Sequence, residues 1–328
     1  HNLFKDLFKA LMTKLLSPNS SDNNIKSKRA LKILSLVTVG SVFLLMVLGG
    51  VVRVTDSGLG CPDWPLCYGK VLPPLEMTAI IEYAHRFVAS VIVSPLILAT
   101  AVIAWVAFRK KLWLIIPATL AILLLIIQAL LGAVTVLQEL PGEIVAAHLS
   151  VSQLLLVTLI LLCVVAFRGP LLVRSESLKD IKIDRLPMLL LSGAAAIFVV
   201  IISGSVVTAT GSTAACVTWP LCQGELFPKD FAAAIHMGHR LAVAVLGLFI
   251  MYVLHLGIRN RRYPKAVKIM SMAVTTIFML QIVIGAGTVW SGFPISLLAI
   301  HLAMATLTLG LAACLAFITF TEQVKLSE

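Results

Sequence analysis

The chain has 328 residues, of which 59% are hydrophobic and only 12% are charged, and its net charge is +11 at pH 7. This composition excludes a soluble globular domain and is typical of a polytopic membrane protein. The positive charge does not indicate a nucleic-acid partner, because it lies in short segments between long apolar stretches. We therefore expect an all-α protein that crosses the membrane several times, contacts lipid and binds no nucleic acid.

The N-terminal segment, residues 1–30, is too polar to cross a membrane. Apolar residues recur at helical spacing in its first part, with lysines between them, and residues 17–24 are rich in Ser, Asn and Asp. The pattern predicts a short amphipathic helix on the cytoplasmic membrane surface, followed by a flexible linker.

Eight apolar stretches follow, and each is long enough for a spanning helix, which needs about 20 residues. The polar linker 168–185 divides them into two halves of four helices, 31–167 and 186–320, and residues 321–328 form a tail. The predicted helices lie at residues 31–54, 79–108, 112–137, 143–167, 186–209, 232–258, 265–289 and 295–320.

Lys and Arg gather in every second loop. They precede the first helix and join helices 2 and 3, helices 4 and 5, and helices 6 and 7, whereas the loops between are sparse in both residues. By the positive-inside rule, the linker and both termini face the cytoplasm. We expect a multi-pass protein of the cell (inner) membrane.

The first half of the sequence returns in the second half. The segments 61–69 and 216–224 share the pattern Cys-x2-Trp-Pro-Leu-Cys-x-Gly at an offset of 155. The His-Arg pair at 85–86 returns at 239–240 at an offset of 154, and other landmarks return at 153. Landmarks in the same order at nearly constant offset indicate a tandem duplication of a four-helix bundle.

Two cysteine pairs lie in the loops after helices 1 and 5, which the charge pattern places outside the cytoplasm. The spacing of six residues and the turn-forming Trp-Pro-Leu between them allow two disulfides, Cys61–Cys67 and Cys216–Cys222. Two interpretations stay open: structural staples, or at least one pair that cycles between dithiol and disulfide. A metal site is disfavoured, because each loop offers only two thiols.

Four histidines lie at matched depths inside the predicted helices. His85 and His148 lie in helices 2 and 4, which run parallel, and His239 and His301 repeat them in helices 6 and 8. At 1.5 Å per residue, both rings of the first half lie roughly 8–9 Å below the start of their helices. Facing imidazoles inside a bundle favour heme iron with two histidine ligands over zinc, whose tetrahedral shell would stay unfilled.

Polar residues beside these histidines indicate further roles. Arg86 and Arg240 directly follow their histidines and either bind heme propionates or extend to lipid headgroups. Glu82 shares a helix face with His85, and the repeat replaces it with His236. A carboxylate at this depth is costly, which favours a proton-handling or substrate-activating group over an interfacial residue turned to water. The difference predicts that one heme is modified while the other transfers electrons.

These motifs resemble the heme A synthase family. The resemblance rests on the paired Cys-x5-Cys loops, on Glu-Tyr-Ala-His-Arg at 82–86, on Met-Gly-His-Arg at 237–240 and on the single histidines of helices 4 and 8. It covers residues 31–320. It implies a membrane-bound, heme-dependent oxidoreductase that oxidises the C8 methyl group of heme O to a formyl group by successive hydroxylations. The product, heme A, would go to terminal cytochrome oxidases.

The resemblance also implies a different task for each half. Heme O, the substrate, would lie between His85 and His148, with the catalytic Glu82 near its methyl group. Heme b, a bound cofactor, would lie between His239 and His301.

The residues do not specify the electron donor, for which a quinol and an iron–sulfur protein are the candidates. Exposed apolar helices favour self-association or a complex with the synthase that makes heme O. Two other functions fit parts of the pattern. A diheme b-type electron carrier leaves the difference between Glu82 and His236 unexplained, and a disulfide-forming quinone oxidoreductase leaves the histidines without a role.

Overall fold

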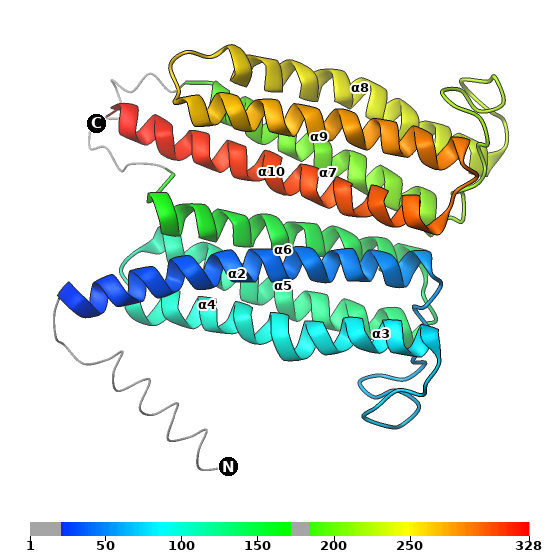
Figure 1. Ribbon diagram of the computed structural model, residues 1–328, viewed down its shortest axis with the longest axis horizontal. Helices are drawn as coiled ribbons and strands as arrows, with labels where there is room; N and C mark the ends of the chain where they lie inside the picture. The colour runs from blue at the N-terminus through cyan, green and yellow to red at the C-terminus, as the bar shows by residue number, and fades with distance from the viewer. Residues whose placement is uncertain (1–20, 172–183, 328) are drawn as a thin grey trace.

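A computed structural model describes residues 21–171 and 184–327 of the chain (Figure 1). Within these ranges, eight helical spans are long and apolar enough to cross a membrane, which confirms the predicted all-α fold class. The segments are α2 (Ser21–Val54), α3 (Met77–Phe87), η1 (Val88–Val93), α4 (Ser94–Ala107), α5 (Leu112–Leu137), α6 (Gly142–Arg168), α7 (Leu186–Ala209), α8 (Phe231–Arg259), α9 (Lys265–Trp290) and α10 (Ile295–Ser327).

The predicted helix ends differ from the observed ones mainly at the two ends of the chain. α2 begins at Ser21 rather than at residue 31, because no glycine or proline interrupts the helix between Ser21 and Leu31. For the same reason α10 continues through the predicted tail to Ser327. Most of the predicted amphipathic segment and of the 168–185 linker lies outside the described residues.

The second span contains a turn that the sequence analysis missed. Between α3 and α4 the chain forms a wider π-helical turn, η1. Pro95, in the first turn of α4, has no backbone N–H to donate to the preceding turn, and the Ser94 hydroxyl instead donates to the carbonyl of Ala89 at 2.8 Å. The turn lies just beyond the segment that carries Glu82 and His85.

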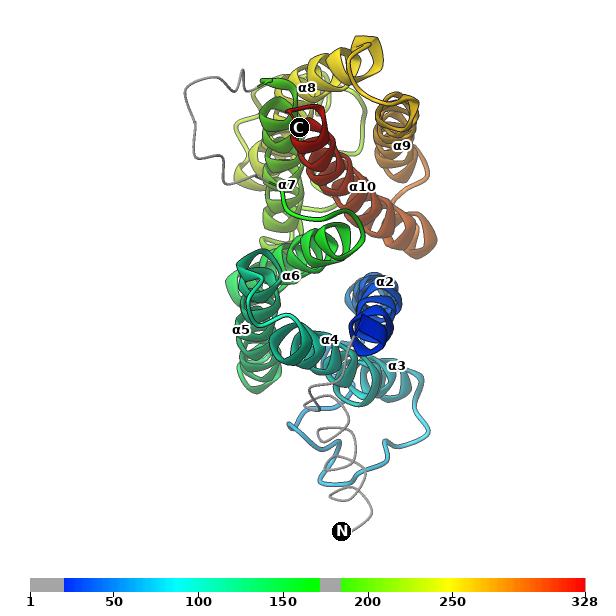
Figure 2. The same ribbon diagram turned by 90° about the vertical axis from the view of Figure 1, so that its left-hand side faces the viewer.

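The spans lie in two groups of four. α2, α3 with α4, α5 and α6 form the first group, and α7 to α10 form the second (Figures 1 and 2). The cysteine loops, 55–76 and 210–230, lie at the same end of the molecule, which we call the disulfide end. We call the opposite end, with the loops 108–111 and 260–264, the basic end.

The two groups meet through α2, α6, α7 and α10 (Figure 2). Gln153 of α6 donates to the Thr306 hydroxyl of α10 at 2.9 Å, in a buried position. Near the disulfide end, Arg53 donates to the carbonyl of Thr208 at 3.0 Å. These partners are 153 and 155 residues apart, which are the offsets of the sequence repeat. Contact between equivalent positions is the pattern that a two-fold relation between the groups would produce.

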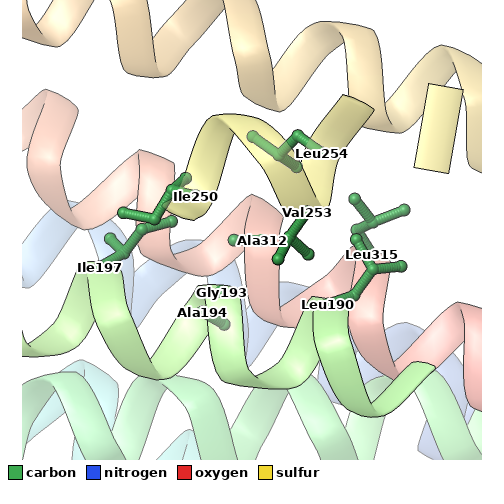
Figure 3. A pocket seen from close by; sticks show the side chains of 9 residues that line it. All are labelled: Leu190, Gly193, Ala194, Ile197, Ile250, Val253, Leu254, Ala312 and Leu315. Carbon is green, nitrogen blue, oxygen red and sulfur yellow. The ribbon is translucent and has the colours of Figure 1, made fainter. Parts of the chain in front are cut away.

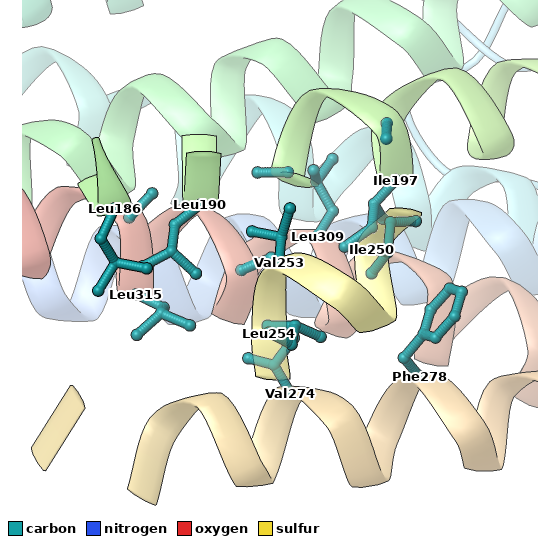
Figure 4. Close-up of a cluster of buried hydrophobic side chains, with 14 of the residues drawn as sticks. Leu186, Leu190, Ile197, Ile250, Val253, Leu254, Val274, Phe278, Leu309 and Leu315 are labelled. Atoms are coloured by element: carbon teal, nitrogen blue, oxygen red, sulfur yellow. The ribbon is translucent and has the colours of Figure 1, made fainter. Parts of the chain in front are cut away.

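Apolar side chains fill the second group towards the basic end. Leu190, Ile250 and Val274 belong to a buried cluster contributed by α7, α8, α9 and α10 (Figure 4). A small apolar pocket lies within it, and at its wall Gly193 of α7 faces Val253 of α8 (Figure 3). Close packing of this kind, with small residues at helix contacts, holds helices together in lipid. This packing holds together the helices that carry the second histidine pair towards the disulfide end.

A glycine at the contact between the groups allows a test of this arrangement. A Cβ built on Gly142 would overlap the backbone carbonyl of Ala209, whereas a Cβ on Gly287 of α9 would meet open space. We expect Gly142→Ala to lower the free energy of unfolding by about 1–3 kcal/mol through overpacking. Gly287→Ala should leave it unchanged or raise it by about 0.5–1 kcal/mol. Unfolding midpoints in a denaturing-detergent titration measure both, and equal midpoints would contradict the contact.

Candidate functional site

The histidines predicted to bind heme lie on four different helices, in the part of the molecule near the disulfide end. His85 lies eight residues after the start of α3, and His239 lies eight residues after the start of α8. His148 and His301 each lie six residues after the start of α6 and α10. At 1.5 Å per residue these positions are roughly 12 Å and 9 Å along their helices. The two halves therefore place their histidines in the same way.

The structure brings the predicted histidine pairs together. His85 lies near His148, and His239 lies near His301. The Nδ1 atoms of His85, His148 and His301 are buried and have no hydrogen-bond partner among the described residues. Only His239 has such a partner there: its Nδ1 lies 2.8 Å from the hydroxyl of Ser203.

Glycines on neighbouring helices make room for the first ring of each pair. A Cβ on Gly49 of α2 would lie 3.0 Å from Cε1 of His85. A Cβ on Gly204 of α7 would lie 3.1 Å from Cε1 of His239. A Cβ at either position would require the imidazole to shift by a few tenths of an ångström.

Glutamines hold the second ring of each pair. The amide nitrogen of Gln128 donates to the backbone carbonyl of His148 at 3.1 Å and lies 3.1 Å from its ring Nε2. Gln281 makes the same two contacts with His301, at 3.0 and 3.4 Å. An amide nitrogen only donates, so the ring Nε2 accepts and the ring proton lies on Nδ1. Both imidazoles therefore have the unprotonated Nε2 that a metal ligand needs.

These features fit a heme with two histidine ligands. Each half offers two imidazoles on different helices of one four-span group. In the described part of the chain, no group of three or more His, Cys, Asp or Glu residues could hold a bare metal ion. A site of two histidines suits a metal that brings its remaining ligands with it, as heme iron does. Iron at Nε2 of His148 would replace the contact from Gln128, whose bond to the carbonyl can persist.

Glu82 is buried beside the first histidine pair. It is 5% exposed, and its Oε1 accepts a hydrogen bond from Nε of Arg86 at 2.8 Å. This burial does not fit a carboxylate turned to water. At the equivalent place, His236 is 7% exposed and its Nε2 lies 3.4 Å from Arg240. The two halves thus share an arginine at this place and differ in the group that the arginine contacts.

The same two arginines hold the cysteine loops against their helices. Arg86 donates to three carbonyls of the first loop at 2.6 to 3.0 Å. Arg240 donates to the three equivalent carbonyls of the second loop at 2.6 to 3.4 Å. The sequence analysis missed this role, and the predicted contact with heme propionates stays a prediction. The carbonyls belong to Cys61, Asp63 and Leu66 and to Cys216, Thr218 and Leu221.

Both cysteine pairs are joined. The sulfurs are 2.02 Å apart in Cys61–Cys67 and 2.03 Å apart in Cys216–Cys222. All four residues are at most 1% exposed. Thiol–disulfide exchange requires an attacking thiolate to reach a sulfur. Their burial therefore favours structural staples over a pair that cycles.

Each bridge closes a tight turn. Tyr68 and Gly69 have φ angles of 52° and 70°, and the backbones of Cys67 and Lys70 pair on either side. Two central residues with positive φ define a type I′ turn, which glycine adopts without strain at the second position. The second loop forms the same turn, with Gly224 at the matching place.

The fold and the site together define an eight-span membrane protein that carries a histidine pair inside each group of four spans. The sequence model of the COX15-CtaA family of cytochrome oxidase assembly proteins matches residues 32–80 and 76–313. The chain belongs to this family.

Curated relatives agree with this assignment. A heme A synthase of Exiguobacterium sp. is 31% identical over 291 residues, which cover 88% of this chain and 93% of the relative. The heme A synthase of Halalkalibacterium halodurans is 30% identical, with 83% of this chain and 91% of the relative covered. That of Bacillus licheniformis is 29% identical, with 83% and 90% covered. The family resemblance inferred from the motifs is confirmed.

Several residues around the histidines were not predicted from the sequence. Gly49 and Gly204 are equivalent at the offset of 155, so a longer comparison of the repeats would have found them. Ser203 leaves no such signal, because its equivalent in the first half is Leu48. Ser203 is noticed only through its contact with His239 of α8, which the structure shows.

The turn of the first cysteine loop should depend on pH. Asp63 accepts hydrogen bonds from the backbone N–H groups of Gly69 and Tyr68 at 2.7 and 2.6 Å. The bond from Gly69, then that from Tyr68 and the charge of Arg86, hold the pKa of Asp63 below its ordinary value of 3.8. Because the pKa is lowered in the folded state, the carboxylate stabilises the turn above pH 3.8, and this stabilisation is lost as the pH falls further.

We expect the hydrogen-exchange protection factors of the Tyr68 and Gly69 amides to fall below about pH 4, as the carboxylate takes up a proton. The Gln223 amide of the second loop donates to the neutral Thr218 hydroxyl at 2.7 Å and should keep its protection. Asp63→Thr should make the first loop as insensitive to pH as the second. An unchanged pH profile in this variant would contradict the role of Asp63.

Proposed function

We propose that this protein is a heme A synthase, an enzyme that oxidises the C8 methyl group of heme O to a formyl group within the membrane. Membership of the cytochrome oxidase assembly family and the heme A synthases that align with most of the chain support the proposal. One observation carries it: a buried carboxylate, Glu82, lies one helical turn from a ligand histidine in the first half only.

The reaction requires a group that handles protons. Each hydroxylation is a two-electron oxidation that replaces one C–H bond of the methyl group with a C–OH bond. With water as the oxygen source it releases two protons and two electrons, and with O2 it consumes two protons and two electrons and releases one water. The geminal diol formed by the second hydroxylation loses water to give the formyl group. A carboxylate held at fixed geometry beside the reacting carbon can accept or deliver these protons. Glu82 is only 5% exposed, so bulk water has little access to the carboxylate.

The first half is the substrate half. His85 and His148 hold heme O, and Gln128 orients His148 through its bond to the backbone carbonyl. Arg86 binds Oε1 of Glu82 and the loop carbonyls at once, so the carboxylate keeps its position beside His85. Glu82 is the catalytic group, and Arg86 is a positioning residue.

The second half is the cofactor half. His239 and His301 hold heme b, and Gln281 orients His301 as Gln128 orients its partner. Heme b, when bound, supplies electron transfer. His236 stands in place of the carboxylate at this site, so the second half carries an imidazole where the first half carries Glu82. We assign the oxidation to the half that carries the carboxylate.

The protein lies in the cell membrane with both termini in the cytoplasm. The basic end carries the charged segments 109–111 and 259–262, which favours the cytoplasmic side. The two disulfides lie at the opposite end, and disulfides persist outside the reducing cytoplasm. Two independent signals thus support one orientation.

Mass-resolved chromatography of hemes extracted from cells that make heme O tests the proposal. Wild-type protein should produce heme A and its hydroxylated intermediate. Glu82→Gln should retain heme but lower conversion by about 10²- to 10⁴-fold, because it loses the proton-handling group. Glu143→Gln, at an exposed position in the first turn of α6, is the matched control and should convert heme O normally.

Two outcomes would contradict parts of the proposal. Normal conversion by Glu82→Gln would remove Glu82 from the catalytic role. Unmodified heme O alongside bound heme in the folded wild-type protein, with a supplied electron donor, would instead favour a diheme electron carrier.

A further inference from the structure

The two halves hold their first histidine differently. The Nδ1 of His239 lies 2.8 Å from the hydroxyl oxygen of Ser203 on α7. The Nδ1 of His85 is buried and has no partner within the described ranges. At the offset of 155, the position of Ser203 corresponds to Leu48, whose side chain has no hydrogen-bonding group.

The direction of the Ser203 contact follows from its second bond. The Ser203 hydroxyl donates its single proton to the carbonyl of Val200 at 2.7 Å. Its oxygen is therefore the acceptor in the contact with His239, and Nδ1 of the ring is the donor. The ring proton is thus held on Nδ1, which leaves the lone pair on Nε2 for a metal.

Other features of the two sites match, so this contact stands out. The glycines beside the rings, Gly49 and Gly204, leave the same space. The second histidines, His148 and His301, both lack a partner at Nδ1 in the described structure and both contact a glutamine amide. The two halves therefore differ in the hydrogen bonding of His85 on α3 and His239 on α8. The same two helices carry Glu82 and His236.

A hydrogen bond from the far nitrogen of a ligand histidine fixes its tautomer and ring orientation and makes it a stronger donor to the metal. A histidine without this bond rotates more freely and binds more weakly. Such a difference suits an enzyme whose two hemes have opposite fates: one is retained through many turnovers, and the other must enter as substrate and leave as product.

We propose that Ser203 is a positioning residue that makes His239 a permanent iron ligand. Leu48, at the equivalent position, gives His85 no hydrogen bond, so His85 is a ligand from which heme can be released. The inference rests on the proposed function, because it assigns the resident heme to the second half and the exchanging heme to the first. It makes the difference between serine and leucine at this position a determinant of which half retains its heme.

The test measures heme loss rather than turnover. Purified protein loaded with hemin is mixed with excess apomyoglobin, which captures the heme released. The wild type should lose heme in two phases, fast from the first half and slow from the second. Ser203→Ala should accelerate the slow phase by about 10- to 100-fold. Leu48→Ser should slow the fast phase, because it supplies the missing hydroxyl.

Controls separate positioning from general damage to the fold. Ser203→Thr keeps the hydroxyl and should restore slow release. Ser192→Ala, which removes an exposed serine of α7 with the same bond to the carbonyl three residues earlier, should match the wild type. Ser203→Ala should also raise the midpoint potential of the slowly released heme, because a weaker imidazole donor stabilises ferric iron less.

Unchanged release and potential in Ser203→Ala would overturn the inference. So would equal acceleration in Ser203→Thr or Ser192→Ala, which would point to damage to the helix. Heme A production is measured on the same samples. If heme release depends on Ser203 but no heme A is formed, the proposed synthase function is refuted and the positioning role of Ser203 stands. The two failures are therefore distinguishable.

Discussion

A polar side chain inside a membrane must find its partners within the protein, because lipid offers none. The histidine sites follow from this constraint. The amide of Gln128 contacts both the ring and the carbonyl of His148, and Gln281 does the same for His301. Glycines leave the space that the rings occupy, and apolar packing towards the basic end keeps the helices in register. The second imidazole of each pair, His148 or His301, is thus oriented by the glutamine of the neighbouring helix.

The cysteine loops belong to the same arrangement. Arg86 is bonded at once to Glu82 on its own helix and to three carbonyls of the first loop. A guanidinium group suits this task, because its several N–H groups point outwards in one plane. The disulfide and the tight turn keep those carbonyls in place. Loop, arginine and carboxylate therefore form one structural unit at the disulfide end of the first half.

The two halves share a framework and differ at a few positions, and these differences carry the proposed division of labour. Glu82 corresponds to His236, so only the first half carries a carboxylate at this place. Leu48 corresponds to Ser203, which gives the firmly held histidine to the second. In the proposed function, a shared framework with local differences would let one chain modify one heme and retain another.

The sequence by itself determined the eight spans, the repeat, the four histidines and the cysteine pairs, because span length, loop charge and residue spacing are local properties of the chain. It did not predict the π-helical turn before Pro95 or the extension of α2 to Ser21. Only the tertiary structure decided that Arg86 binds loop carbonyls and that Ser203 accepts from His239. These contacts join segments that are distant in sequence, and their geometry depends on how neighbouring helices face each other.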